Sequence, residues 1–313
     1  MTRPTAGQQT KRLFSRDDYL APPAIPTGQQ PKDVLNTIWR KNEVFLDITD
    51  YTPGSAVMVI WPMILASFWM CLPADGDGLD PLLATVCGII VGIPTLIVLY
   101  GLTQPAPLPT RFNRQRREVC VPQADGTYWI VPWESVEAQA VAVDTYGQHG
   151  KMTHGLLTIG FRNPDPDAPE GERDYSIGFN CGGGTTAMCL WECIRSYMEV
   201  GPEVVPDRLS RFENKRGIIA SYVFDVIEVG KTKGWVRALL WDGLCGLFLF
   251  NVLLIYAIER KKLTPPPDFT DPAIVEWSQP LPPEQWAKRS PELEAAIQAR
   301  EAELAAQMEA KQV

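Results

Sequence analysis

The sequence has few of the residues, and none of the motifs, from which most catalytic and metal sites are built. It has two histidines, His149 and His154, and they lie five residues apart in a glycine-rich stretch without companion ligands. The glycines at 182–184 precede no Lys-Ser or Lys-Thr, so they predict a tight turn before a helix and not a phosphate-binding loop. Gly-x-Ser-x-Gly, His-Glu-x-x-His and Cys-x-x-Cys patterns are missing as well. The sequence therefore predicts that the protein is not an enzyme and holds no metal or cofactor.

The cysteines do not predict a disulfide framework. Their number, seven, is odd, and Cys71, Cys87 and Cys245 lie in apolar segments. Cys189 and Cys193 lie four residues apart on a predicted helix. We interpret these cysteines as small buried hydrophobic residues.

Charged residues are missing from two long stretches, and this absence predicts membrane helices. Residues 55–72 and 82–102 contain no Asp, Glu, Lys or Arg. Eighteen helical residues span roughly 27 Å at ~1.5 Å per residue, which is close to a hydrocarbon core of about 30 Å. Residues 55–103 are therefore predicted to form a transmembrane helical hairpin.

A third segment, 235–258, is apolar but contains Arg237, Asp242 and Asn251. A charge at the centre of a bilayer costs ~2.5–3.5 kcal/mol, and less near an end. We predict a third transmembrane helix in which Asp242 and Asn251 are intramembrane polar residues. The alternative is a helix that lies in the interface or packs on the other two.

The distribution of basic residues predicts the side of the membrane on which each segment lies. The N-terminal segment, 1–54, has seven basic residues, whereas the loop 72–81 has none and contains three aspartates. Arginines return soon after the second helix. Because basic segments remain in the cytoplasm, residues 1–54 and 104–234 are predicted to be cytoplasmic. Basic residues are equally frequent on the two sides of the third segment, so the rule does not decide on which side the tail, 259–313, lies. We favour a third segment that crosses the membrane, which puts the tail outside; the alternative is a segment that does not cross.

Residues 104–234 form the segment that is large enough for a core of its own. Alternating apolar and polar residues predict strands in its first half, and Asp125-Gly126 predicts a hairpin. Residues 185–200 have apolar side chains at three- and four-residue spacing, which predicts an amphipathic helix. Antiparallel strands closed by a C-terminal helix are the layout of a pleckstrin-homology-like barrel, and a plain α+β domain contains the same elements. The predicted fold class is thus an α+β membrane protein with a cytosolic β-rich domain.

Two further helices are predicted. Residues 217–229 are apolar but too short to cross a bilayer, so they predict a helix that either lies on the membrane or packs on the domain. The tail begins with a Pro-rich linker and ends in a helix, with Ser290 as its N-cap and Pro291 at its first position.

A basic cluster follows the second membrane helix. Strand alternation puts its arginines on two opposite faces, and the net charge of the chain is -8, so the cluster does not predict a nucleic-acid site. Arginines next to a membrane attract anionic lipid headgroups by ~1 kcal/mol each. We therefore predict membrane-surface contacts by Arg111, Arg114, Arg116 and Arg117.

Three stretches resemble a family of bacterial inner-membrane proteins that are encoded beside type VI secretion effectors. They are RFNRQRREVCVPQADGTYWIVPWESV (111–136), WECIRSYMEVGPEVVP (191–206) and VEWSQPLPPEQWAKRSPEL (275–293). The resemblance implies an immunity protein of the bacterial inner membrane that protects its producer by binding a cognate effector toxin. It implies no particular toxin-binding residues and no oligomeric state.

Two other classes of function fit the same sequence. One is a membrane-anchored scaffold that binds lipids or proteins through the β-rich domain. The other is a small channel or transporter component that uses Asp242 and Asn251.

Overall fold

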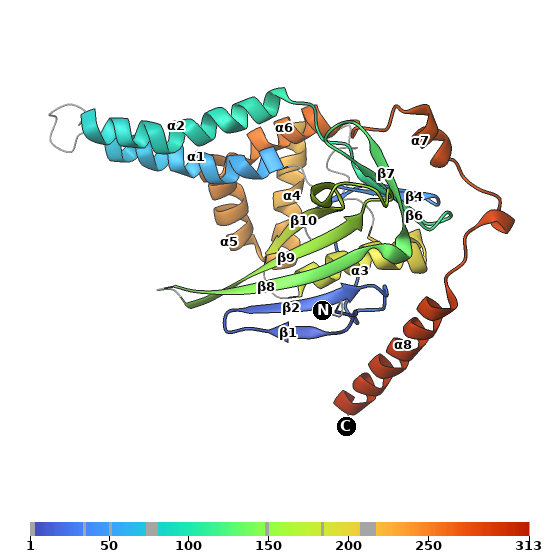
Figure 1. Cartoon of the computed structure of the whole chain (residues 1–313). Helices are drawn as coiled ribbons and strands as arrows, with labels where there is room; N and C mark the ends of the chain where they lie inside the picture. The colour runs from blue at the N-terminus through green and yellow to red at the C-terminus, as the bar shows by residue number, and fades with distance from the viewer. Residues whose placement is uncertain are drawn as a thin grey trace. The chain divides into compact units, whose positions relative to one another are not determined.

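The computed structural model describes residues 4–33, 36–49, 52–72, 81–147, 150–182, 185–206 and 217–312. The chain forms two compact units, each built from segments that are far apart in the sequence (Figure 1). The sheet unit contains Met1–Asp50, Leu108–Arg208 and Asp268–Val313, and the helical unit contains Tyr51–Pro107 and Leu209–Pro267.

The sheet unit contains two antiparallel sheets of five strands each. Sheet A has the order β1-β2-β8-β9-β10. Its strands are β1 (Gln9–Lys11), β2 (Ser15–Ala21), β8 (Glu137–Gly147), β9 (Gly150–Arg162) and β10 (Asp174–Gly182). Side chains alternate across this sheet, as expected for a sheet with one face on the core. On β9, for example, Leu157, Ile159 and Phe161 are buried, whereas Leu156 and Arg162 are exposed.

Sheet B has the order β3-β4-β5-β6-β7. Its strands are β3 (Ile38–Lys41), β4 (Phe45–Ile48), β5 (Thr110–Asn113), β6 (Glu118–Pro122) and β7 (Tyr128–Pro132). The predicted hairpin is confirmed: β6 pairs with β7, and Gly126 in the turn has a φ of 87°. β4 pairs with β5 although the first two helices of the helical unit lie between them in the sequence.

The core of the sheet unit forms where helix α3 (Thr186–Glu199) packs against side chains of both sheets. The predicted amphipathic helix is thereby confirmed, and Leu190, Trp191 and Ile194 on it are fully buried. Trp191 stacks on Trp133 with 5.5 Å between ring centroids. Burying each of these large apolar side chains contributes about 1.5–3 kcal/mol. Short 3₁₀ turns η1 (Trp133–Ser135), η2 (Glu170–Glu172) and η3 (Pro202–Val204) join the larger elements.

The tail belongs to the same unit, in contrast to the predicted division of the chain at 54, 104 and 259. It contains α7 (Pro272–Trp277), η5 (Pro283–Gln285) and α8 (Pro291–Gln312). Ser290 caps α8, as predicted, by accepting a hydrogen bond from the Leu293 amide at 3.1 Å. Leu293 and Ile297 are buried, so the first half of α8 packs against the unit, whereas nearly all residues from 301 to 310 are exposed. The N-terminal segment also differs from the prediction, because it contributes β1–β4 to the two sheets.

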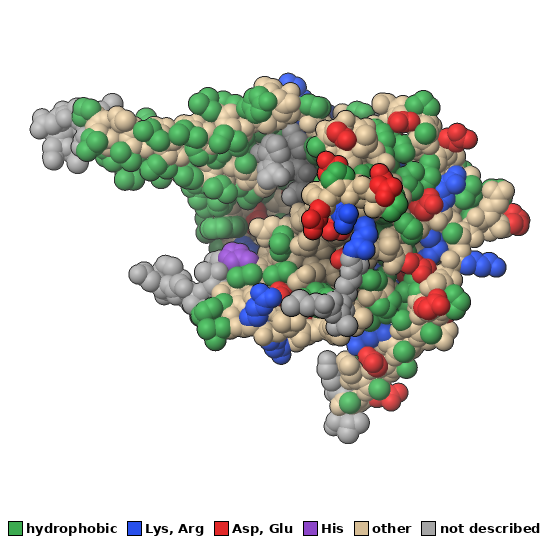
Figure 2. Space-filling model, viewed as in Figure 1, with side chains coloured by type: hydrophobic (Ala, Val, Ile, Leu, Met, Phe, Trp, Pro, Cys, Tyr) green, Lys and Arg blue, Asp and Glu red, His purple; other side chains and the backbone are tan. Residues whose placement is uncertain are grey.

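The helical unit contains two helices that are long and apolar enough to cross a membrane. They are α1 (Thr52–Cys71) and α2 (Pro81–Thr103), and hydrophobic side chains cover their surface (Figure 2). The other elements are α4 (Ile218–Lys233), α5 (Trp235–Arg237), the π-helix η4 (Ala238–Leu249) and α6 (Val252–Leu263). The predicted third membrane helix is not one straight helix, because Trp235–Leu249 and Val252–Leu263 meet at 70°.

Candidate functional site

Arg111 is buried at the point where three distant segments of the sheet unit meet. Its Nε and Nη2 donate to the two carboxylate oxygens of Asp47 at 2.6 and 2.7 Å. Nη2 also donates to Asp268 at 2.8 Å, and Nη1 donates to Ser278 Oγ at 2.9 Å. The guanidinium lies 3.7 Å from the ring centroid of Phe45. The side chain is therefore fully engaged within the protein.

Burial and ion pairing act against each other around Arg111: burial raises the pKa of the Asp47 carboxyl, although the hydrogen bonds and charge of Arg111 and the charge of Arg40 oppose this shift. Burial opposes the charge on Arg111, but hydrogen bonds to Asp47 and Asp268 raise the pKa of its guanidinium. Partial burial also opposes ionisation of Asp268, yet the hydrogen bond from Arg111 lowers the pKa of this carboxyl. Two-pronged arginine–carboxylate pairs of this kind fix geometry as well as charge.

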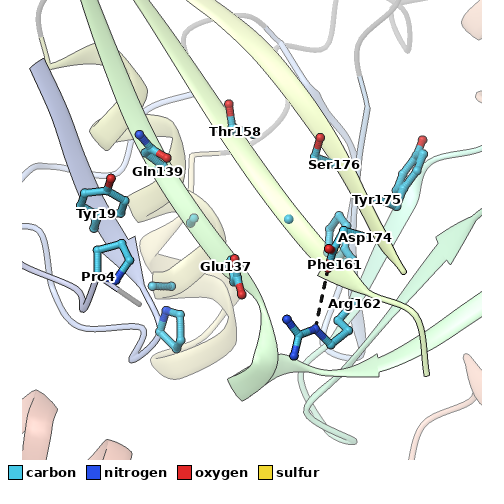
Figure 3. Close-up of a pocket in the computed structure, with 14 residues that line it drawn as sticks. Pro4, Tyr19, Glu137, Gln139, Thr158, Phe161, Arg162, Asp174, Tyr175 and Ser176 are labelled. Atoms are coloured by element: carbon cyan, nitrogen blue, oxygen red, sulfur yellow. Dashed lines mark ion pairs between the residues drawn. The ribbon is translucent and has the colours of Figure 1, made fainter. Parts of the chain in front are cut away.

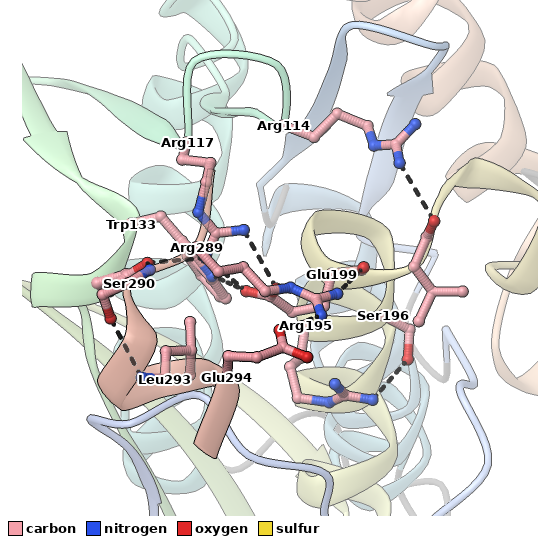
Figure 4. Close-up of polar contacts among 12 residues, drawn as sticks. Arg114, Arg117, Trp133, Arg195, Ser196, Glu199, Arg289, Ser290, Leu293 and Glu294 are labelled. Atoms are coloured by element: carbon pink, nitrogen blue, oxygen red, sulfur yellow. Dashed lines mark hydrogen bonds and ion pairs between the residues drawn. The ribbon is translucent and has the colours of Figure 1, made fainter. Parts of the chain in front are cut away.

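A second buried cluster surrounds Glu199 at the end of α3 (Figure 4). Arg117 donates to both of its carboxylate oxygens, at 2.9 and 3.1 Å. Arg289 from the tail donates at 2.6 Å, and the indole N–H of Trp133 donates at 2.6 Å. Glu134 accepts from Arg117 at 3.1 Å and from the Ser290 amide at 3.0 Å. This cluster joins α3 and the central strands to the start of α8.

The structure gives the predicted membrane-contact arginines a different role. Arg111 and Arg117 are 2% and 8% exposed, so their charged groups lie inside the sheet unit and do not reach lipid headgroups. Arg114 donates to the Val200 carbonyl at 3.1 Å, and Arg116 donates to the Trp277 carbonyl at 2.9 Å. The acidic residues that neutralise the cluster come from distant segments, and a local reading of the basic stretch does not include them.

The two predicted intramembrane polar residues do different things. Asp242 lies on η4, and its Oδ2 is buried without a hydrogen-bond partner in the described part of the chain. Asn251 has a left-handed backbone (φ 50°, ψ 49°), ends η4, and caps α6 by accepting from the Leu254 amide at 3.4 Å. The structure thus makes Asn251 a break between two helices. A polar pair that the sequence does not single out, Asp225 and Tyr256, is joined by a hydrogen bond.

The outer face of sheet A carries a hollow of about 390 Å³ (Figure 3). Its lining residues on the strands include Tyr19, Gln139, Thr158 and Ser176, which present hydroxyl and amide groups. Gly160 lies opposite Glu137 on one side and opposite Ser176 on the other, so the middle strand has no side chain there.

The rim of the hollow is charged. Arg162 and Asp174 form an ion pair with 3.7 Å between Nε and Oδ1, and both side chains are more than half exposed. The hollow is open to solvent and has a mixed lining: Pro22, Ala138 and Phe161 contribute apolar groups beside the hydroxyl and amide groups, and charges of both signs lie at the rim. These properties suit the binding of a segment of another molecule that has both apolar and polar side chains, and no sequence motif predicts them.

The residues that form most metal sites do not cluster here. Among the described residues, no group of three or more His, Cys, Asp or Glu is placed to hold a metal ion. His154 is exposed on β9, and His149 lies outside the described residues. Cys193 is buried, and burial raises the pKa of its thiol, as expected of a packing cysteine.

Comparisons with protein-family models, with curated proteins and with solved structures find no match to this chain.

Proposed function

We propose that this protein is an immunity protein of the bacterial inner membrane, which neutralises a cognate type VI secretion toxin by direct binding. The proposal starts from the family resemblance of the three sequence stretches. In this arrangement α1 and α2 anchor the chain in the membrane, and the sheet unit lies on the cytoplasmic side, as the basic residues before α1 favour.

The hollow on sheet A, lined by both apolar and polar groups, is the observation that carries this proposal. It offers exposed hydroxyl, amide and charged groups on a rigid sheet, which is a suitable surface for a protein partner. Protein–protein recognition needs such complementary polar and charged groups and no reactive side chain. The toxin would insert a segment with both apolar and polar side chains into the hollow beside the Arg162–Asp174 pair.

The order of the strands is compatible with a pleckstrin-homology-like barrel. β4–β7 form a meander of neighbouring strands, β8–β10 form a second, and α3 follows them. We propose that this barrel is the core of the sheet unit, with β1–β3, α7 and α8 added to it. The membrane hairpin would then be inserted between the first two strands of the barrel, β4 and β5.

The proposal is tested by filling the hollow. A Cβ at Gly160 would lie 3.5 Å from the nearest atom of Glu137, an ordinary contact, so Gly160→Arg should fold and project a long side chain into the hollow. We expect this variant to protect cells at least tenfold less well when it is co-expressed with the effector encoded beside it. Pull-down of the effector should fall in parallel.

Gly171→Arg is the matched control. Gly171 is exposed in the same unit and does not line the hollow, and a Cβ there would meet nothing within 4 Å. This variant should protect as well as the unmodified protein. If the unmodified protein neither protects cells nor binds the effector, the immunity function is wrong. If it does both and Gly160→Arg is indistinguishable from Gly171→Arg, the toxin binds elsewhere.

A lipid-binding scaffold is a second candidate, and one observation favours it. The turn between β1 and β2 exposes Leu13 and Phe14 to 84% and 53%, and Lys11 and Arg12 flank them. Apolar side chains beside basic ones are typical of segments that bind anionic membranes. An environment-sensitive fluorophore on Leu13→Cys should shift to the blue in anionic nanodiscs and not in neutral ones. No shift in either lipid would rule this candidate out.

A channel or transporter component is the third candidate, favoured by the buried Asp242 carboxylate oxygen without a partner. Asp242→Asn should then alter ion flux into vesicles that contain the purified protein. Unchanged flux would remove this candidate.

A further inference from the structure

The sheet unit constrains the membrane topology of the whole chain. Its buried ion pairs join the N-terminal segment, the central segment and the tail: Asp47 binds Arg111, Arg111 binds Asp268, and Glu199 binds both Arg117 and Arg289. One folded unit lies on one side of a bilayer. Residues 218–263, which connect the central segment to the tail, must therefore leave and return on the same side.

Helix α6 runs antiparallel to the first turns of α1. Gly54 lies against Ile255 and Glu259, and Trp61 donates its indole N–H to the Phe248 carbonyl at 3.0 Å. From Gly54 to Trp61 along α1, the contacted residues run back from Glu259 to Phe248, so the two segments run in opposite directions. At ~1.5 Å per residue, the level of Trp61 is about 10 Å deeper along α1 than the level of Gly54.

The C-terminal end of α6 lies where α1 begins and α2 ends. Val57 packs with Ile255 and Ile258 near the start of α1, and Lys262 donates to the Gln104 carbonyl at 2.8 Å, just after α2. Both ends of the membrane hairpin that connect to the sheet unit thus lie at this level. Helix α6 is a short helix that runs from a depth of about 10 Å to the membrane surface.

The segment before α6 turns away from the direction of the spans. Trp235–Leu249 meets α6 at 70°, and α6 is aligned with α1. Helix α5 and η4 therefore lie at a large angle to α1 (Figure 1). Helix α4 is antiparallel to η4, because Tyr222 near its start donates to the Asp242 carbonyl at 2.8 Å and Gly230 near its end lies against Trp235. The two form a hairpin that turns at Gly234.

Backbone groups that the irregular helices leave open are satisfied within the helical unit. Tyr222 Oη donates to the carbonyls of Asp242 and Gly243 on η4, and Trp61 donates to the carbonyl of Phe248 at its end. Irregular backbone is tolerated at membrane depth only where protein groups or water satisfy it. The donors from α4 and α1 meet this requirement.

The side chains of this hairpin also indicate that it lies within the bilayer and does not span it. Its exposed apolar residues include Ile219, Val223, Phe224, Ile227, Leu239, Leu240, Leu244 and Phe248. Helix α4 has 16 residues, about 24 Å, which is short for a hydrocarbon core of about 30 Å. Crossing would also bring Lys231, Lys233 and Arg237 to the side of the acidic loop 72–81, against the positive-inside rule.

We propose that residues 218–263 form a re-entrant membrane element: the hairpin of α4 and α5–η4 lies in the leaflet on the side of the sheet unit, and α6 returns from it to that surface. The surface that these helices expose is a lipid-binding surface within one leaflet. This inference does not depend on the proposed immunity function.

Sidedness is tested with single added cysteines in the full-length protein in sealed vesicles. The sites are Ser135→Cys, Gln307→Cys, Lys233→Cys and, in the loop between α1 and α2, Asp77→Cys. A membrane-impermeant maleimide is applied from one side, and each labelled peptide is read by mass spectrometry, so that the native cysteines serve as references. We expect Ser135→Cys and Gln307→Cys to react from one side and Asp77→Cys from the other, and Lys233→Cys not to react from the Asp77 side.

Two results would overturn the proposal. Labelling of Gln307→Cys from the Asp77 side would mean that 218–263 crosses the bilayer an odd number of times. Labelling of Lys233→Cys from the Asp77 side would mean two complete crossings.

Depth provides an independent measurement. A fluorophore on Leu240→Cys should be quenched most by lipids with a nitroxide on the upper part of the acyl chain. The matched control is Ile93→Cys, which is exposed near the middle of α2 and should be quenched most by a deep nitroxide. Equal depth profiles at the two sites would contradict an in-plane hairpin.

Discussion

Asp47 and Arg111 form a two-pronged ion pair that solvent does not reach: the side chains are 0% and 3% exposed, and 64 residues separate them in the sequence. Asp47 is on β4, before the membrane hairpin, and Arg111 is on β5, after it. The pair therefore joins the two strands between which the apolar helices α1 and α2 are inserted in the sequence. We expect the integrity of the sheet unit to depend on it.

Asp47→Asn should destabilise the sheet unit by about 3–5 kcal/mol, because it leaves the Arg111 charge buried without its main partner. The measurement is denaturant unfolding of the detergent-solubilised full-length protein, followed by tryptophan fluorescence. Arg162→Gln is the control, since it breaks the exposed pair with Asp174 and should cost less than about 1 kcal/mol. Equal effects of the two substitutions would show that the Asp47–Arg111 pair has no special role.

Removing the tail should have a larger effect than removing α8 alone. A chain that ends at Pro267 loses Phe269, Ile274 and Trp277, which pack on Cys120, and it also leaves Glu199 without Arg289. A chain that ends at Ser290 keeps these contacts and loses only what α8 buries, such as Leu293 and Ile297. We expect the first truncation to unfold the sheet unit and the second to lower its unfolding midpoint moderately. Protease resistance of the central segment separates the two outcomes.

Local patterns along the chain were sufficient to predict some elements. The uncharged runs predicted the membrane hairpin, Asp125-Gly126 predicted the turn between β6 and β7, and apolar spacing predicted α3. Each of these features is determined by neighbours within about 20 residues.

The rest depends on contacts that no local pattern reveals. The arginines of the basic stretch read as membrane-facing because their acidic partners are distant: Asp268 lies 157 residues after Arg111, and Glu199 lies 82 residues after Arg117. The sequence does not reveal the hollow either, because Gly160 contributes to it only through its position between Glu137 and Ser176 on the neighbouring strands. The basic stretch alone therefore shows that it follows the second apolar helix, but it does not show which residues its arginines bind.

Acid should release the tail from the rest of the sheet unit. Burial opposes ionisation of Glu134, but hydrogen bonds from Ser290 and the charge of Arg117 lower the pKa of its carboxyl below the ordinary 4.5. The same balance, with Arg111 as the main donor, lowers the pKa of Asp268. A carboxyl with a lowered pKa in the folded state contributes stability above its unfolded pKa, and this contribution is lost as the pH falls through the folded value.

We therefore expect cleavage of the tail linker between α7 and α8 by an acid-active protease to increase as the pH falls below about 4. Glu134→Gln should remove part of this pH dependence and raise cleavage at neutral pH. The opposite trend, with the tail better protected in acid, would mean that these carboxyls do not hold it.

Asn251 is expected to act through its backbone, and two substitutions separate this role from a polar one. Its left-handed conformation costs an alanine roughly 1–2 kcal/mol, whereas glycine adopts it without a steric penalty. Both substitutions remove the side-chain cap to Leu254. Asn251→Ala should therefore lower the unfolding midpoint of the detergent-solubilised protein more than Asn251→Gly does. If both lower it equally, the amide itself is the important group, and its place among the polar residues of the membrane segment becomes the better explanation.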